Sequence, residues 1–269
     1  MKPIPLQSGI IYGPVRSRRL GMSLGLNASP ISYKLCSFNC VYCQYGNTTV
    51  CTTEVADRLN DFPTPDGFGR ALETALQENE EIDNITFSGN GEPTLHPRFE
   101  ELVDIAKRLG ERYFPQARLG ILSNSSTMGL ENVFRALAKL DFKIMKLDVG
   151  SLETFKKLNR PCKGIDYRTI LNGLQSLENV TLQTMFIGGK IQNIGDREIG
   201  QWIERVGKIR PIKAQIYSLH RPPAESFLEE VPVKRLQAIS VQAEKTNGVP
   251  MEVIVAASPY RRKIIRYWK

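Results

Sequence analysis

The sequence predicts an α/β fold, an incomplete (βα)6 TIM-like barrel with parallel strands, a short N-terminal arm and a C-terminal basic helix. One observation is that β-rich runs alternate with amphipathic helical patterns from residue 34 to about residue 247. The other is length, because 269 residues suit one large barrel domain, and no Pro/Gly/Ser-rich linker divides the chain. Strands that alternate with helices favour βαβ units and therefore a parallel sheet.

The predicted strands and helices follow one another in regular order. Six strands are expected, at 31–36, 84–90, 118–124, 143–150, 180–189 and 212–220. Six helices are expected, at 66–79, 97–110, 129–140, 166–177, 197–209 and 233–246. The first helix shows the basis of the assignment, since its apolar residues recur at the spacing of one helix face: Phe68, Ala71, Leu72, Ala75 and Leu76.

Three regions are expected along the chain. Residues 1–30 form an arm packed on the core, residues 31–247 form the barrel, and residues 248–269 form a strand and a basic helix. Ligands of such folds collect at the carboxyl ends of the parallel strands. The functional residues should therefore lie in the loops that follow the strands.

Charge is concentrated at the two ends of the chain. The net charge is +8, of which residues 1–53 carry +5 and the last ten residues another +5, because neither segment contains Asp or Glu. These basic ends favour an anionic partner such as RNA, although a solvated helix and an arginine-rich loop would explain them equally well. No stretch is apolar enough for export or a membrane span. We therefore expect a cytoplasmic protein with reduced thiols and no membrane partner.

Three cysteines in the segment "YKLCSFNCVYCQYG" (33–46) are spaced C-x3-C-x2-C: Cys36, Cys40 and Cys43. Thiolates are soft ligands that suit iron–sulfur clusters, zinc or copper(I). A zinc site needs a fourth ligand, for which Cys51 or Cys162 is available. Alternatively, three cysteines could hold three irons of a cubane [4Fe–4S] cluster and leave one iron open.

This spacing, with Tyr42 just before the last cysteine, resembles the signature of the radical S-adenosylmethionine (SAM) superfamily. The surrounding stretch from Tyr12 to Gly46 further resembles wyosine-synthase-like members, some of which modify tRNA. The resemblance implies an oxygen-sensitive enzyme whose [4Fe–4S] cluster binds SAM at its open iron. It also implies a one-electron donor such as flavodoxin or ferredoxin. Because no cysteine precedes Cys36, we expect a single cluster and not the two clusters of the wyosine synthases.

The resemblance also implies residues that contact SAM at the ends of the next strands. The segment "SGNGEPTLH" (88–96) is similar to the glycine-rich motif that receives the SAM amino group, and "SNSS" (123–126) follows the next strand. A tight turn and a helix cap are the structural alternatives. In "KIMKLDVG" (143–150) a Lys and an Asp share one face and either pair with each other or meet SAM. The expected SAM contacts are Tyr42, Gly89, Asn90, Gly91, Glu92, Ser123, Asn124, Lys146 and Asp148.

Polar residues on the last two predicted strands are candidates for substrate binding. Gln183, Gln215 and Tyr217 either face the barrel interior as pocket residues or serve as ordinary polar fillers. The segment "SLHRPPAES" (218–226) places His220 and Arg221 at the rim, where Arg suits carboxylate or phosphate.

Three functions follow from these expectations. The first is a radical SAM enzyme that forms a 5′-deoxyadenosyl radical and abstracts hydrogen from an anionic substrate such as tRNA. The second is an activase that installs a glycyl radical on a partner protein. The third is a non-catalytic iron–sulfur or zinc protein.

Overall fold

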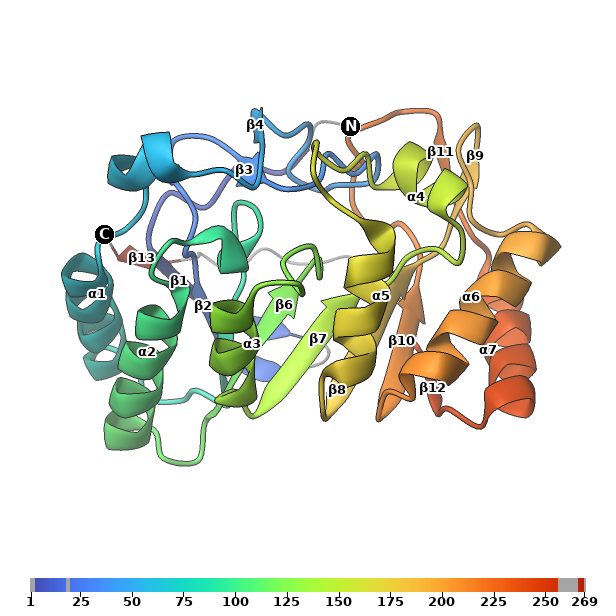
Figure 1. The fold of residues 1–269 in the computed structure, drawn as a ribbon. Helices are drawn as coiled ribbons and strands as arrows, with labels where there is room; N and C mark the ends of the chain where they lie inside the picture. The colour runs from blue at the N-terminus through green and yellow to red at the C-terminus, as the bar shows by residue number, and fades with distance from the viewer. Residues whose placement is uncertain (1–2, 18–19, 256–265, 269) are drawn as a thin grey trace.

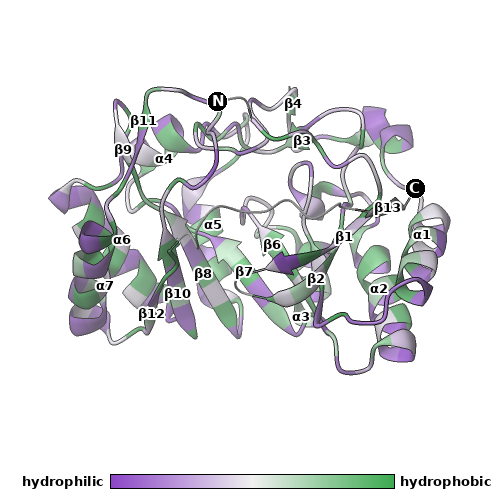
Figure 2. Ribbon diagram, turned by 180° about the vertical axis from the view of Figure 1, so that it is seen from behind, coloured by the Kyte–Doolittle hydropathy of each residue, from purple (hydrophilic) through white to green (hydrophobic). Residues whose placement is uncertain are grey.

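The computed structural model describes residues 3–17, 20–255 and 266–268. A nine-stranded sheet runs through the molecule in the order β12-β10-β8-β7-β6-β5-β2-β1-β13. Helices cover one face of this sheet (Figure 1), and the view from behind in Figure 2 looks onto the strands. The predicted α/β class and incomplete barrel are confirmed, because β12 and β13 form the two edges of a sheet that does not close within the described residues.

Seven parallel strands make up the barrel portion of the sheet. They are β2 (Gly21–Leu26), β5 (Asn84–Phe87), β6 (Arg118–Ser123), β7 (Phe142–Lys146), β8 (Val180–Met185), β10 (Lys213–Tyr217) and β12 (Met251–Val253). Five of them match predicted strands. β1 (Ile11–Ser17) pairs antiparallel with β2, so the expected N-terminal arm contributes two strands to the main sheet.

The prediction for the first barrel strand was wrong. That position belongs to β2, whereas residues 31–36 supply only β3 (Leu35–Cys36), which pairs with β4 (Val50–Cys51) in a separate small sheet. Glycine weakens the strand pattern of β2. Gly25 is needed there because a Cβ atom would lie 2.2 Å from Cζ of Tyr12 in the neighbouring strand.

The six predicted helices are all present. Their bounds are α1 (Pro65–Gln77), α2 (Phe99–Tyr113), α3 (Glu131–Ala138), α5 (Tyr167–Ser176), α6 (Asp196–Ile209) and α7 (Val233–Asn247). One helix was not predicted, α4 (Leu152–Leu158), whose seven residues are too few for a clear periodic pattern. Its start is capped by Ser151, whose hydroxyl accepts a hydrogen bond from the backbone N–H of Thr154 at 3.1 Å.

The core lies between the helices and the sheet. Phe68 of α1, Phe87 of β5 and Phe99 of α2 are completely or almost completely buried and contact one another through their rings. At the other end of the sheet, Trp202 of α6 is fully buried against Phe186. This apolar layer fixes the sheet, so that the loops after its strands start from defined positions.

The C-terminal basic helix is not found in the part of the segment that the structure describes. Arg266–Trp268 form strand β13, which pairs antiparallel with β1 and places Trp268 opposite Ile11. The open edge of β1 offers unpaired backbone groups that an extended segment can satisfy. Residues 256–265 and 269 of the predicted segment lie outside the described residues.

The loops after the parallel strands gather above the sheet, at the top of Figure 1. This end of the molecule also carries the two-stranded β3–β4 sheet, the 3-10 helices η1 (Ala56–Asp61) and η2 (Pro93–Leu95), and a second small sheet of β9 (Ile187–Gly189) and β11 (Leu228–Glu230). Among the described residues, no helix combines the length and apolar character that crossing a membrane requires.

Candidate functional site

The cysteine segment crosses the loop end of the barrel and is anchored to α4. The backbone N–H groups of Asn39 and Val41 donate to the carbonyls of Arg160 and Leu158, each at 3.0 Å. The N–H of Cys43 donates to the carbonyl of Cys40 at 3.1 Å, which turns the chain between these two cysteines. These bonds hold the three-cysteine segment against the barrel through its backbone.

Two of the three cysteine sulfurs accept a hydrogen bond from the amide side chain of an asparagine. Nδ2 of Asn124, after β6, lies 3.5 Å from Sγ of Cys36, and Nδ2 of Asn159, after α4, lies 3.5 Å from Sγ of Cys40. Burial raises the pKa of Cys36 well above its ordinary value and that of Cys40 to about 12. Hydrogen bonds to sulfur are a common means of tuning iron–sulfur sites.

The donor set of the cysteine segment is three thiols, with amide groups beside two of them. No three Cys, His, Asp or Glu side chains of the described chain converge as one bound metal ion requires. The zinc interpretation needs four ligands around one point. A cubane [4Fe–4S] cluster is held by cysteine thiolates, each on a different iron. Three soft thiol ligands, two of them beside amide donors, fit the chemistry of such a cluster.

The loop after β5 packs directly on the strand that leads into the cysteines. A Cβ atom on Gly91 would lie 1.7 Å from the carbonyl oxygen of Leu35, so only glycine fits this approach. Gly89 has a φ of 140° and lies against Asn27. Asn90 is fully buried, and its amide donates to the carbonyls of Gln7 and Pro30. The predicted glycine-rich motif thus holds together three segments of the loop end.

Glu92 forms the polar centre of this loop. Its Oε1 accepts from Thr94 and, at 2.8 Å, from the hydroxyl of Ser123, and its Oε2 accepts from the N–H of Asn124 at 2.6 Å. Burial raises the pKa of Glu92, although these donors oppose the shift. The structure therefore brings together Glu92, Ser123 and Asn124, which sequence reasoning had selected from two separate strand ends.

Lys146 and Asp148 form the ion pair that was one of the two predicted alternatives. Nζ of Lys146 lies 2.8 Å from Oδ1 of Asp148 and 3.2 Å from the hydroxyl of Tyr217. Burial alone would lower the pKa of Lys146, but the Asp148 carboxylate and the Tyr217 hydroxyl raise it above its ordinary value. Nζ also lies 5.0 Å from the ring centre of Tyr42, a cation–π distance.

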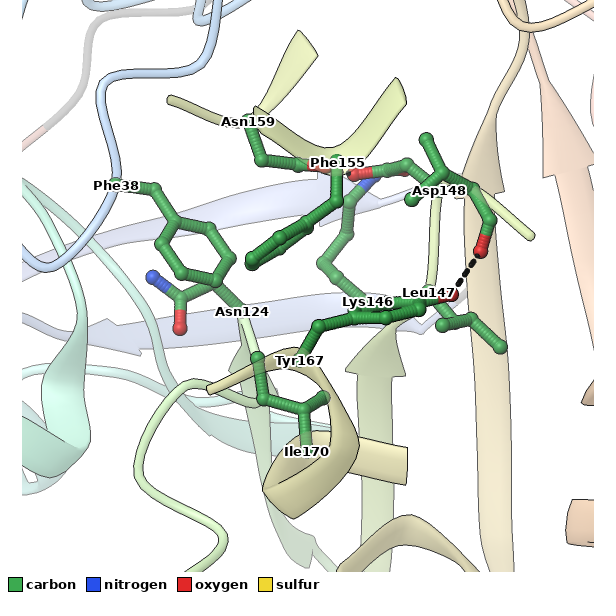
Figure 3. Close-up of a pocket in the computed structure, with 10 residues that line it drawn as sticks. Phe38, Asn124, Lys146, Leu147, Asp148, Phe155, Asn159, Tyr167 and Ile170 are labelled. Carbon is green, nitrogen blue, oxygen red and sulfur yellow. Dashed lines mark hydrogen bonds and ion pairs between the residues drawn. The ribbon is translucent and has the colours of Figure 1, made fainter. Parts of the chain in front are cut away.

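Asp148 joins this pair to the cysteine segment. Its carboxylate accepts hydrogen bonds from the hydroxyl of Tyr42, from Nδ2 of Asn159 at 2.9 Å and from the N–H of Met185 at 2.9 Å. Figure 3 shows Asp148, Lys146 and Asn159 together with Phe38 and Phe155 among the residues that line a small cavity. Burial, followed by the nearby Asp148 carboxylate, raises the pKa of Tyr42. Tyr42 is therefore neutral and tied to Asp148.

The predicted substrate residues on β8 and β10 form one chain of hydrogen bonds. The Tyr217 hydroxyl donates to Oε1 of Gln183 at 3.1 Å, and Nε2 of Gln215 donates to Oε2 of Glu252 at 3.0 Å. The amides of Gln183 and Gln215 lie 3.4 Å apart. Through Tyr217 this chain continues to Lys146, so it reaches the cysteine segment from the far strands of the sheet.

The loop after β10 contacts the cysteine segment at the rim. Nη1 of Arg221 donates to Oε1 of Gln44 at 2.6 Å, and the N–H of Glu225 donates to the carbonyl of Val41 at 3.0 Å. Nε2 of His220 is buried and has no hydrogen-bond partner among the described residues. Buried polar nitrogens are usually hydrogen-bonded in folded proteins.

Two residues of the site were not identified as site residues from the sequence. Asn159 follows the unpredicted helix α4, and its asparagine identity carried no recognisable pattern. Gln7 precedes β1, and its Nε2 donates to the hydroxyl of Tyr45 at 2.9 Å while its Oε1 is buried without a partner among the described residues. Both are brought to the site by contacts between segments distant in sequence, which a local pattern does not reveal.

Comparison with known proteins identifies the family of the chain. The family model of the radical SAM superfamily matches residues 31–203, and the chain therefore belongs to the radical SAM superfamily. It is an enzyme whose cofactors are a [4Fe–4S] cluster and SAM, as predicted. The expectation of a non-catalytic iron–sulfur or zinc protein is overturned by this membership.

Curated relatives are similar over most of the chain. A UPF0026 protein of Synechocystis sp. is 32% identical over 226 residues, covering 81% of this chain and 79% of that protein. A protein of Brachyspira hyodysenteriae named GTPase Obg is 33% identical over 221 residues, covering 80% of this chain. The chain spans only 31% of that longer protein.

Solved structures share the fold at low sequence identity. TYW1, a wyosine synthase solved with a lysine–pyruvate adduct bound, has a TM-score of 0.57 and 15% identity, covering 84% of this chain and 74% of its own. SuiB of Streptococcus suis, solved with its precursor peptide SuiA, has a TM-score of 0.62 and 11% identity, covering 86% of this chain and 48% of its own. These likenesses concern the barrel fold.

Proposed function

We propose that this enzyme cleaves SAM reductively and uses the resulting radical to abstract hydrogen from an anionic substrate such as RNA. Cys36, Cys40 and Cys43 hold the cluster. The observation that carries the proposal is the pair of amide contacts from Asn124 and Asn159 to the sulfurs of Cys36 and Cys40, because structural or incidental cysteines do not require such donors. The cluster, when bound, supplies the electron that cleaves SAM to methionine and a 5′-deoxyadenosyl radical.

The loops after β5 and β6 are the proposed shelf for SAM. Within the described part of the chain, Oε2 of Glu92 accepts one hydrogen bond, from the N–H of Asn124, and its remaining acceptor capacity suits the SAM amino group. Gly89 and Gly91 precede Glu92 in the same loop and pack on Asn27 and Leu35, and Ser123 and Asn124 donate to the Glu92 carboxylate. The side chain of Asn90 is engaged by Gln7 and Pro30, so its proposed contact with SAM is through its backbone.

Tyr42, Lys146 and Asp148 complete the cofactor side of the site. The carboxylate of Asp148 accepts from several donors within the chain, so we assign it the positioning of Tyr42 and Asn159 beside the cluster. The ring of Tyr42 then presents a face for the adenine of SAM. Lys146, paired with Asp148, balances negative charge next to the thiolates of the cluster.

The substrate side is formed by β8, β10 and the loop after β10. Gln183, Gln215 and Tyr217 offer amide and hydroxyl groups, and the buried Nε2 of His220 offers a further hydrogen-bonding position. Arg221 at the rim, together with the basic ends of the chain, favours an anionic substrate. We place the enzyme in the cytoplasm with a flavodoxin or ferredoxin as electron donor, since reduced thiols and low-potential electrons are needed there.

A protein substrate is the second candidate. Within the described residues the sheet does not close, since β12 and β13 are its two edges. A sheet with free edges suits an extended peptide segment as substrate, as required of an activase that installs a glycyl radical on a partner. The basic ends favour RNA over this alternative.

The decisive experiment is anaerobic reconstitution with iron and sulfide, followed by incubation with SAM and dithionite. We expect about four irons per chain and formation of 5′-deoxyadenosine, measured by liquid chromatography with mass detection. Cys36→Ala, Cys40→Ala and Cys43→Ala should abolish both. The matched variant Cys51→Ala should retain both, and loss of the cluster in Cys51→Ala would contradict the three-cysteine site.

A further inference from the structure

The two cysteines outside the proposed cluster site lie side by side. Cys51 ends β4 and is exposed, and Cys162 is partly exposed in the segment between α4 and α5. Their thiols are close enough to share a hydrogen bond. Nothing in the proposed reaction uses either thiol, although together they form a pair of neighbouring nucleophiles from two distant parts of the chain.

This pair flanks the first cysteine of the cluster segment. Cys51 is the register partner of Cys36, and the N–H of Thr52 donates to the carbonyl of Cys36 at 3.1 Å. The N–H of Cys162 donates to the carbonyl of Ser37 at 2.9 Å. A covalent bond between Cys51 and Cys162 would therefore join the two segments that hold the backbone of Cys36 and Ser37.

A hollow of about 350 Å³ is lined by residues that follow the two cysteines in the chain. Thr53 lines this hollow, and its hydroxyl is hydrogen-bonded to the thiol of Cys162. Gly164 and Ile165, just after Cys162, line the same hollow. Cys51 is exposed and Cys162 is partly exposed, so a low-molecular-weight disulfide can reach the pair from solvent.

We propose that Cys51 and Cys162 form a reversible disulfide by exchange with a low-molecular-weight disulfide. The sulfur of the exposed Cys51 attacks the small disulfide, forming a mixed disulfide and releasing one small thiol, which takes the proton of Cys51. The sulfur of Cys162 then displaces the second small thiol, which takes the proton of Cys162. The protein pair is oxidised by two electrons, and the small disulfide is reduced to two thiols.

The expected consequence is a more firmly held cluster segment. A disulfide restricts the unfolded chain, and the effect is greater for long closed loops such as the one between Cys51 and Cys162. The oxidised chain should therefore unfold at a temperature about 4–16 °C higher than the reduced chain. The proposal concerns residues outside the cluster site and does not depend on the radical reaction.

The test uses the reconstituted full chain and oxidised glutathione under anaerobic, mildly alkaline conditions, because burial raises the pKa of both thiols. Remaining thiols are alkylated, and the digest is analysed by mass spectrometry. We expect one cross-linked peptide that pairs Cys51 with Cys162 and disappears with dithiothreitol. Cys51→Ser and Cys162→Ser should each lose the cross-link and the thermal shift.

Several outcomes would overturn the proposal. They are alkylation of both cysteines without reaction, separate mixed disulfides on each, or a stoichiometric zinc ion bound by the pair. A chain that forms the Cys51–Cys162 bond but assembles no cluster would count against the proposed function alone. A chain that assembles the cluster but leaves this pair reduced would count against the disulfide alone.

Discussion

At the scale of single residues, the site depends on amide groups that reach the cysteine sulfurs from other elements. A hydrogen bond to a cluster sulfur stabilises the reduced state, which carries more negative charge. Asn124→Ala should remove such a bond from Cys36. A bond worth about 0.5–1.5 kcal/mol corresponds to roughly 20–60 mV for one electron. We expect the cluster potential of the variant to be more negative by this amount in an anaerobic redox titration followed by electron paramagnetic resonance.

Asn172→Ala is the matched control, since Asn172 lies on the exposed face of α5. Its cluster potential should equal that of the unchanged chain. An unshifted potential in Asn124→Ala, with the cluster intact, would mean that the amide does not act on the cluster.

Sequence reasoning located these residues better than it identified their partners. The cysteines were found because their spacing is local, and Asn124 was found because it ends a strand. Its contact with Cys36 depends on how two loops meet in the folded chain, which the sequence does not display. The same holds for Asn90, whose side-chain hydrogen bonds to the carbonyls of Gln7 and Pro30 the sequence did not indicate.

At the scale of elements, the loop after β5, which is part of the proposed SAM shelf, packs on β3 and so lies next to the cysteine segment. The Cβ atom introduced by Gly91→Ala would lie 1.7 Å from the Leu35 carbonyl oxygen, so the two backbones must separate. Overpacking of this kind costs about 1–3 kcal/mol. We expect a lower urea midpoint of unfolding and lower iron content after reconstitution.

Gly200→Ala provides the comparison, because nothing lies within 4 Å of the added Cβ atom on α6. Alanine is favoured over glycine inside a helix by about 0.5–1 kcal/mol, so this variant should be slightly more stable and keep its iron. Equal urea midpoints and equal iron contents in the two variants would show that neither stability nor cluster binding depends on the close approach of Gly91 to Leu35.

Elements with a strong periodicity of apolar residues were predictable from the sequence, and short elements were not. The amphipathic helices were located because each buries one apolar face against the sheet. The strand β2 was missed because its glycines, of which Gly25 makes room for Tyr12, weaken the strand pattern. The pairing of β13 with β1 joins the two ends of the chain, and a local pattern of basic residues could not indicate it.

At the scale of the whole molecule, the uneven charge separates an RNA substrate from a protein substrate. Contacts between Lys or Arg and phosphate release counterions, so affinity for RNA falls steeply with salt. If the five basic residues of the last ten contact phosphates, log K should fall with log salt at a slope of about −3.5 to −4.5. Affinity for bulk tRNA should then drop about 100–500-fold between about 50 and 200 mM salt.

Neutralising part of the C-terminal charge tests whether this segment carries the affinity. The variant Arg261→Gln, Arg262→Gln, Lys263→Gln changes residues whose placement lies outside the described structure but whose charge is certain. Its salt slope should be shallower by about 2–3. The control variant Lys107→Gln, Arg108→Gln, Arg112→Gln removes the same charge from the exposed face of α2 and should keep the original slope. Fluorescence titration of labelled tRNA measures the salt slopes of both variants. Absence of tRNA binding at low salt would exclude RNA as the substrate and favour a protein substrate.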